Sequence, residues 1–197
     1  MLSYKEARVG VEGLLDQNIL RRAKSKIMAA QQNNLLKICR DGKLVEVSEA
    51  LQAGADPNTK GGCRVDGSLR DFVTCLMVAI VRNHEEIVDL LLAEPGIEIN
   101  AKDSRKETAL YYACRGGNVV ILSKLLAVPG ILVNERNYYN HGWSPIMEAV
   151  FRGKPNVVWM MASVDKVVLD VELEGCKNHA RCRGWKYLQG LESMACG

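Results

Sequence analysis

The feature that most constrains this chain is a loop that occurs twice. The stretch EPGIEINAKD at 94–103 and the stretch VPGILVNERN at 128–137 both contain Pro-Gly-Ile and then an Asn four residues after the Gly. Their prolines, Pro95 and Pro129, lie 34 residues apart. A period of that size indicates a repeat protein, in which one supersecondary unit recurs along the chain.

The segments that precede these loops match as well. Residues 74–100 and 108–134 align without a gap. A third copy covers 144–170, and a shorter copy covers 34–58. Coincidence is a poor explanation for four matches in register, so we predict about four repeats that stack on one another.

Each copy contains two short helical patterns. In the second copy, Leu76, Ala79 and Ile80 share one helix face, and Ile87 and Leu91 share another. A hydroxyl can cap the start of the first helix, and Gly or Asn tolerates the left-handed backbone at its end. The expected caps are Thr74, Thr108 and Ser144, with Pro145 and Pro155 at first helical positions. The expected turns between helices are Asp41-Gly42, Asn83-His84, Gly116-Gly117 and Gly153-Lys154.

These residues resemble the ankyrin repeat family over roughly 34–170. The family pattern Thr-Pro-Leu-His-x-Ala is followed by Thr74-Cys-Leu-Met-x-Ala79, Thr108-Ala-Leu-Tyr-x-Ala113 and Ser144-Pro-Ile-Met-x-Ala149. The second half of the pattern is followed by Gly-Ala-Asp-Pro-Asn at 54–58. In place of the family's His stand Met77, Tyr111 and Met147. The resemblance implies an all-α fold: a solenoid of about four helix-turn-helix repeats with hairpin-like loops.

We expect three parts along the chain. Residues 1–33 form a basic helical segment, 34–170 form the array, and 171–197 form a divergent C-terminal cap or a disordered tail. The repeats are expected at about 34–59, 71–101, 103–135 and 139–170, with an inserted loop near 60–70. That insertion is either a solvated loop or a binding loop on the tip side of the solenoid.

The N-terminal segment 12–32 has an amphipathic pattern. Leu15, Ile19, Ala23 and Ile27 recur every four residues. Its basic residues, largely elsewhere on the helix, are Arg21, Arg22, Lys24 and Lys26. Three interpretations stay open: a helix that caps the first repeat, a helix that binds a partner, and a disordered segment. The run RRAKSK is also a weak match to a nuclear import signal.

The composition excludes several classes of protein. A net charge of +3 is too small to indicate a nucleic-acid binder, and no apolar run is long enough to span a bilayer. Seven cysteines, an odd number, occur without a signal peptide, so we interpret them as reduced thiols. We therefore expect a monomer in the cytoplasm, with the nucleus as an alternative, and no contact with nucleic acid or membrane.

Few patterns in the chain point to catalysis. The sequence has no phosphate-binding Gly loop and no nucleophile elbow. A Cys114–His84 pair is the only candidate nucleophile and base that we considered, and Cys114 lies at a core position of the repeat. Cys176, His179 and Cys182 have a spacing that could hold zinc. We expect no enzyme and no cofactor, and keep a metal-binding or enzymatic protein that uses these three residues as the alternative.

The resemblance implies a protein–protein interaction module that binds on its concave face. At the variable positions before the inter-helix turns, every repeat has one arginine: Arg40, Arg82, Arg115 and Arg152. The hairpin tips add Arg105, Glu107, Tyr139, His141 and Trp143. Arginine and aromatic residues are enriched in interface hot spots, and guanidinium groups form charge-assisted pairs with carboxylates and phosphates. We therefore predict that the partner presents an acidic or phosphorylated segment.

Overall fold

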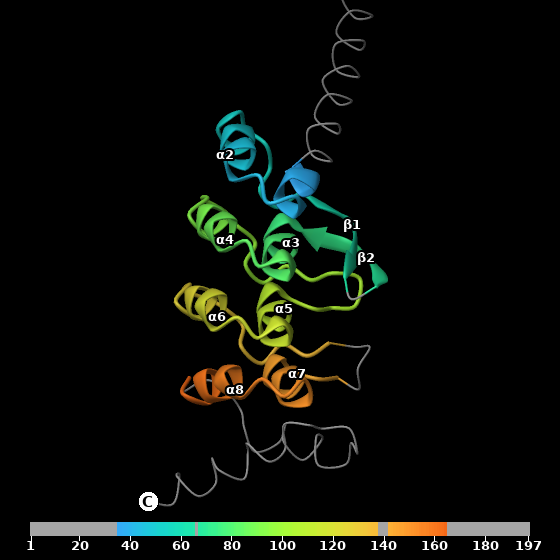
Figure 1. Ribbon diagram of the computed structural model, residues 1–197, viewed down its shortest axis with the longest axis vertical. Helices are drawn as coiled ribbons and strands as arrows, with labels where there is room; N and C mark the ends of the chain where they lie inside the picture. Colours follow the sequence, from blue (N-terminus) through green and yellow to red (C-terminus); the bar gives the residue numbers. More distant parts are fainter. Residues whose placement is uncertain (1–34, 66, 138–141, 165–197) are drawn as a thin grey trace, which may run out of the picture.

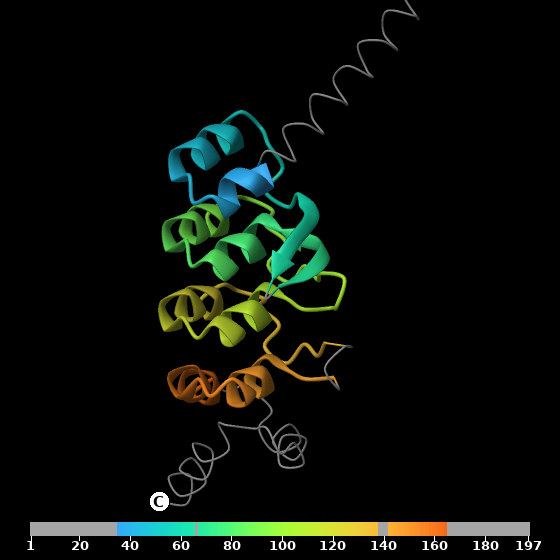
Figure 2. The same cartoon turned by 45° about the vertical axis from the view of Figure 1, so that its right-hand side comes forward.

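The computed structural model describes residues 35–65, 67–137 and 142–164. Its helices come in antiparallel pairs that stack along one axis (Figure 1, Figure 2). The pairs are residues 35–40 with α2 (Leu44–Gln52), α3 (Cys75–Arg82) with α4 (Glu85–Leu92), α5 (Ala109–Gly116) with α6 (Val119–Leu126), and α7 (Pro145–Phe151) with α8 (Pro155–Ala162). The prediction of a helix-turn-helix repeat solenoid is confirmed.

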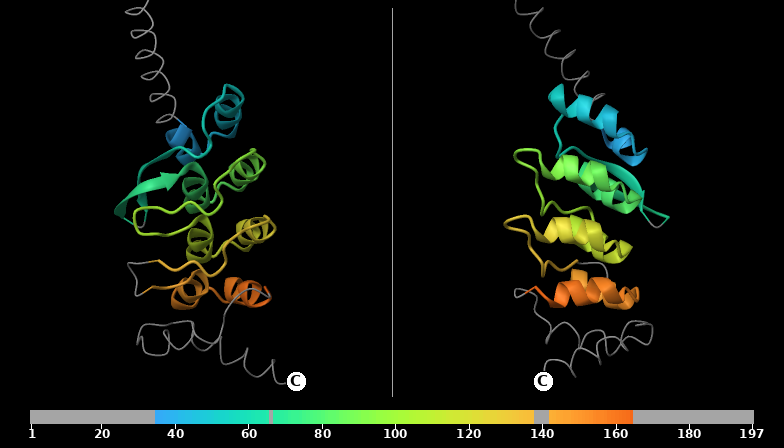
Figure 3. Two further views of the ribbon diagram at one scale, coloured as in Figure 1. Left: turned by 180° about the vertical axis from the view of Figure 1, so that it is seen from behind. Right: turned by 60° about the vertical axis from the view of Figure 1, so that its left-hand side comes forward.

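The two helices of each pair lie in different columns. The first helices form the inner column beside the loops, and α2, α4, α6 and α8 form the outer column (Figure 1). Seen from two further directions, each pair makes one layer of the stack (Figure 3). Contacts run mainly within a layer and between adjacent layers, as in α3 with α5 and α5 with α7. The fold is therefore held by neighbouring repeats.

The predicted caps start the inner helices. The side chains of Thr74, Thr108 and Ser144 each accept a hydrogen bond from the backbone N–H three residues further on. Each cap satisfies one of the backbone donors left free at a helix N-terminus. Pro145 and Pro155 occupy first helical positions, as expected. Local sequence thus sets where these helices begin.

The turn inside each layer is tight and is covered by the next layer. Gly42 has φ of +75°, and a Cβ there would lie 2.6 Å from Cε1 of His84. The His84 ring also places Nε2 3.2 Å from the carbonyl oxygen of Arg40. Two layers further on, the side chain of Lys154 lies against Gly117 in the same way. Small residues in these turns therefore let the layers approach each other closely.

The repeated loop is explained by two asparagines. Asn58 donates from Nδ2 to the carbonyl oxygen of Gly96 at 2.9 Å and accepts from the N–H of Glu98 at 2.7 Å. Asn100 binds the next Pro-Gly-Ile loop in the same way, through the Gly130 carbonyl and the Leu132 N–H. Each asparagine thus fastens one repeat to the loop of the next repeat.

The insertion near 60–70, which the sequence predicted only as a loop, contains a β-hairpin. Strands β1 (Lys60–Val65) and β2 (Ser68–Thr74) pair antiparallel, with a register irregularity between Gly61 and Cys63. Opposite that irregularity, Phe72 has φ of +60°, a left-handed conformation that is unusual for a bulky residue. The hairpin lies beside α3 on the loop side of the stack (Figure 1).

One face of the hairpin packs against the array, and the other face is open to solvent. Cys63, Val65 and Val73 are buried against the array, whereas Leu69 and Phe72 are exposed. The backbone of Asp71 exchanges two hydrogen bonds with Ser104 in the following loop, at 2.9 and 3.1 Å. The hairpin is therefore anchored to the second and third layers.

Candidate protein-binding surface

Three of the four predicted arginines reach solvent. The Arg40 side chain is 43% exposed, and its Nε lies 3.3 Å from Oδ1 of Asp41. Arg82 is exposed and makes no ion pair with any of the described residues. Arg152 has a side chain that is 41% exposed and donates to Oε1 of Glu148 at 2.9 Å. The predicted arginines therefore reach solvent in the first, second and fourth layers.

Arg115 is buried, which corrects the expectation of a continuous exposed row. Only 8% of this residue is exposed. Its Nε donates to Oε1 of Glu148 at 2.9 Å, and its Nη2 donates to Oε1 of Glu107 at 2.7 Å. Two carboxylates, one in its own layer and one in the next, thus draw the guanidinium away from solvent.

Glu107 is also buried, so it is not an exposed tip residue. Its side chain is fully covered, and its Oε2 lies 3.8 Å from Nη2 of Arg70 on β2. Charges therefore alternate through the stack, from Arg70 through Glu107, Arg115 and Glu148 to Arg152. Because buried charges are costly unless paired, this alternation ties the hairpin, α5 and α7 together.

The chemistry of Glu148 follows from this setting. Burial by itself opposes ionisation, but the adjacent Arg115 guanidinium and hydrogen bonds from Tyr111 and Arg152 outweigh it, so the pKa of Glu148 is lowered. The hydroxyl of Tyr111 donates to Oε2 at 2.9 Å. Burial, followed by the nearby negative charge of Glu148, raises the pKa of Tyr111. Glu148 is thus held as a carboxylate and Tyr111 as a neutral phenol, both structural roles.

The predicted tip residues differ in their exposure to solvent, and two of them lie outside the described residues. Trp143 is buried, with its ring centroid 4.7 Å from that of Phe151, so it is a packing residue rather than an exposed contact. Arg105 is half-buried, and its backbone N–H donates to Oδ1 of Asp103 at 2.9 Å. Tyr139 and His141 lie outside the described residues.

A small hollow lies beside Arg40 and was missed by sequence reasoning. It has a volume of about 110 Å³. Its lining residues are Leu36, Lys37, Arg40, Gly61, Gly62, Cys63 and Val78. Lys37 is exposed and precedes Arg40 by three residues, so both lie on one helix face. That spacing could have identified Lys37 from the sequence as a neighbour of Arg40. The positions of Gly61 and Gly62 beside Arg40 could not have been identified in this way, because they depend on the fold of the hairpin.

The described residues give no support to the catalytic candidate. Cys114 is fully buried, and that burial, with Glu148 nearby, raises the pKa of its thiol. A reactive cysteine needs the opposite shift. Within 35–65, 67–137 and 142–164, His, Cys, Asp and Glu side chains form no group of three that could hold a metal ion. Cys176, His179 and Cys182 lie outside these ranges.

Among the described helices, none has the length and apolar character needed to cross a bilayer.

The comparison with family models agrees with the layered geometry. Residues 76–170 match the model described as ankyrin repeats, in three copies. Residues 76–170 are ankyrin repeats. The match spans the layers from α3 through α8, and such repeats are generally protein–protein interaction modules.

Similar curated proteins contain the same repeats inside longer chains. Protein fem-1 homolog A-like of Mus musculus is 34% identical over 85 residues, which is 43% of this chain and 12% of that protein. Ankyrin repeat and KH domain-containing protein mask-1 of Caenorhabditis elegans is 38% identical over 86 residues, 43% of this chain and 3% of that protein.

A third relative is a plant protein. The probable E3 ubiquitin-protein ligase XBOS32 of Oryza sativa subsp. japonica is 32% identical over 117 residues, 58% of this chain and 21% of that protein. The aligned part of this chain thus spans between 3% and 21% of the length of these three relatives.

Proposed function

We propose that this ankyrin repeat chain is a non-catalytic adaptor module that binds a partner protein along its concave face. The partner presents an acidic or phosphorylated segment there. The binding residues are Arg40, Arg82 and Arg152 at the ends of inner helices, with Lys37 beside the first of them.

The observation that carries this proposal is the state of Arg82. It is exposed in the middle of the array and has no carboxylate partner among the described residues. Arg40 and Arg152 flank it above and below, each with more than two-fifths of its side chain exposed. An anionic segment that runs along the stack would meet all three cations, and charge-assisted hydrogen bonds would form at each.

The other residues of the predicted site have structural roles in this proposal. Arg115, Glu107 and Trp143 are buried and hold the layers together. The alternative, a metal-binding or enzymatic protein that uses Cys176, His179 and Cys182, has no support from the described part of the chain.

The test compares two variants with the same change in charge. In the first, Arg40, Arg82 and Arg152 are replaced by Ala. In the matched control, Lys60, Lys102 and Lys124 are replaced by Ala; these lysines form ion pairs at partly exposed positions. Exposed ion pairs contribute little stability, and without Arg152 the buried Glu148 still accepts hydrogen bonds from Arg115 and Tyr111, so both variants should remain folded. Proteins captured from a lysate by the unmodified chain are identified, purified and titrated by calorimetry at two salt concentrations.

We expect the arginine variant to bind at least about 10-fold more weakly and with a smaller salt dependence, because rim charges contribute mainly salt-sensitive binding. The lysine variant should bind within about 2-fold of the unmodified chain. Equal weakening in both variants would show that total charge, and not this row of arginines, governs binding. Unchanged binding in both would exclude the charge argument and leave the adaptor proposal to be tested on other surfaces.

A further inference from the structure

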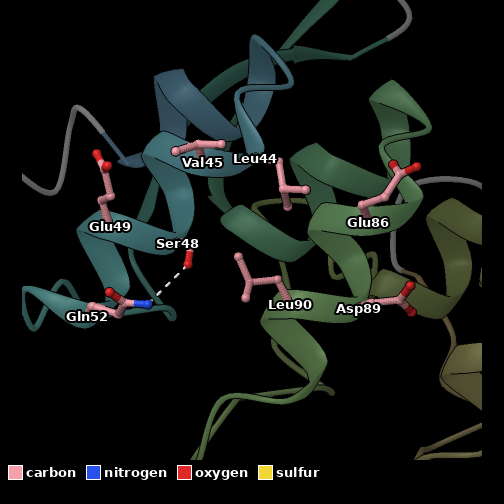
Figure 4. A pocket seen from close by; sticks show the side chains of 8 residues that line it. All are labelled: Leu44, Val45, Ser48, Glu49, Gln52, Glu86, Asp89 and Leu90. Carbon is pink, nitrogen blue, oxygen red and sulfur yellow. Dashed lines mark hydrogen bonds between the residues drawn. The ribbon is translucent and has the colours of Figure 1, made fainter.

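A second recognition surface lies in the outer helix column. Helices α2 and α4 enclose a groove with a volume of about 610 Å³ (Figure 4). Its lining residues are Leu44, Val45, Ser48, Glu49, Gln52, Glu86, Asp89 and Leu90. The lining residues all belong to α2 and α4, which lie in the outer column (Figure 1), and none of them is an arginine of the inner helices. It is therefore separate from the surface proposed above.

The floor of the groove is apolar and open to solvent. Leu44 is 40% exposed and Val45 is 69% exposed, and the half-buried Leu90 faces them from α4 (Figure 4). Single exposed apolar residues are common on protein surfaces, but several gathered in one hollow indicate an interaction site. Burial of these side chains would favour an occupant with an apolar stripe.

The walls of the groove are acidic. Glu49 and Glu86 are exposed, and neither makes an ion pair with any of the described residues. Asp89, the third acidic residue, is paired with Lys124 of α6 at 2.7 Å. No lysine or arginine is among the lining residues. An occupant with basic residues beside its apolar stripe would neutralise the two free carboxylates.

Among the described residues, an ion pair crosses the gap between the next two outer helices, α4 and α6, but not the gap between α2 and α4. Between α4 and α6, Lys124 reaches across to Asp89. Between α2 and α4, no described ion pair crosses the gap, and the cation nearest in sequence, Lys43, is paired with Glu46 at 2.6 Å within the same turn. The α2–α4 groove thus lacks the lysine that bridges the equivalent gap below it.

One segment of this chain has the complementary pattern. Its apolar stripe is Leu15, Ile19, Ala23 and Ile27, and its basic residues are Arg21, Arg22, Lys24 and Lys26. These residues lie outside the described part of the chain, so their character is known from the sequence alone. We propose that residues 15–27 bind the α2–α4 groove as an amphipathic helix, with the stripe on Leu44, Val45 and Leu90. Arg22 and Lys24, which flank the stripe on its two sides at helical spacing, then contact Glu49 and Glu86.

The connection is long enough for this contact to form within one molecule. Residues 28–34 separate the stripe from the first described helix and can span up to ~24 Å. That helix, residues 35–40, is only ~9 Å long. A tethered segment also has a high effective concentration, so modest contacts suffice to keep it bound.

The test is hydrogen–deuterium exchange with mass spectrometry on the full chain. In one variant, Glu49→Lys and Glu86→Lys reverse the groove charges. In the matched control, Glu94→Lys and Glu98→Lys make the same change in net charge outside the groove. We expect the groove variant to exchange about 10-fold faster over 15–27, with no such change in the control. Restoring complementarity by Arg22→Glu and Lys24→Glu in the groove variant should recover protection.

Four results would overturn the proposal. The first is that residues 15–27 are unprotected in the unmodified chain, and the second is that both charge variants leave their protection intact. The third is that the charge swap does not recover protection. The fourth is that protection depends on protein concentration. The last result would assign the groove to a second copy of the chain. Circular dichroism melting of each variant confirms that the array itself is folded.

Discussion

At the scale of single residues, Glu148 shows how a repeat protein can bury charge. Its carboxylate accepts hydrogen bonds from Arg115 and Tyr111 in the third layer and from Arg152 in its own layer. The lowered pKa of Glu148 means that the folded protein favours its ionised form. Removal of that charge would leave the buried Arg115 with one carboxylate, Glu107, in place of two.

We predict that Glu148→Gln lowers the free energy of unfolding by about 1–3 kcal/mol at neutral pH, because Gln loses the charge-assisted hydrogen bonds. The difference from the unmodified chain is pH-dependent. A carboxyl group whose pKa is lower in the folded protein stabilises it fully above the ordinary value of 4.5, and this contribution is lost as pH falls through the folded-state pKa. Urea unfolding between pH 3 and pH 7 measures it.

The matched control is Glu98→Gln, at a side chain that is 54% exposed and paired with Lys60. We expect that substitution to change the free energy of unfolding by less than about 1 kcal/mol at any pH in this range. If the two variants lose equal stability, or if the Glu148→Gln difference persists unchanged at pH 3, the buried pairing does not contribute as described.

Sequence reasoning placed the four arginines at the ends of the inner helices, and the structure buries one of them, Arg115. The repeat register gives the position of Arg115 along α5, and that position was correct. Its side-chain direction depends on Glu107 and Glu148, which lie 8 and 33 residues away in the chain. Glu148 takes the register position of the buried Val78 and Tyr112, and an acidic residue there was the available signal.

At the scale of elements, the helices were predictable and the hairpin was not recognised. Caps, prolines and turn residues act locally, so Thr74, Thr108 and Ser144 could be identified from neighbouring residues alone. The sequence did contain a local signal, because the dipeptide Asp-Gly, which occurs at 66–67, favours a two-residue turn between strands. We predicted only an inserted loop there, from the extra length of this repeat.

We predict that Asn100→Ala destabilises the array by about 1–2 kcal/mol, because the Gly130 carbonyl and the Leu132 N–H each lose a partner. Asn100→Asp is the control, since its carboxylate can still accept from the Leu132 N–H but cannot donate to Gly130. Chemical denaturation should therefore rank Asp between Asn and Ala. If Ala is no worse than Asp, the asparagine is not fastening the loop.

At the scale of the whole molecule, stability should follow the order of the layers. Leu110 is buried in α5, in the third layer, and contacts between inner helices continue on both sides of it. Leu35 is equally buried but lies in the first described layer. In a stack held by nearest neighbours, a defect in a central layer weakens two interfaces, whereas a defect in a terminal layer weakens one.

Leu110→Ala and Leu35→Ala each remove the same buried methyl groups. We predict that they cause a similar local loss of stability but accelerate hydrogen exchange in different numbers of layers. Each should cost about 2–5 kcal/mol locally. Hydrogen exchange should accelerate in every described layer for Leu110→Ala, because both interfaces of the third layer weaken. For Leu35→Ala, it should accelerate mainly over 35–58 and leave α5 to α8 close to their original protection. Equal acceleration across the array for both variants would show that the layers unfold as one unit, in which case no terminal layer can open by itself to admit a partner.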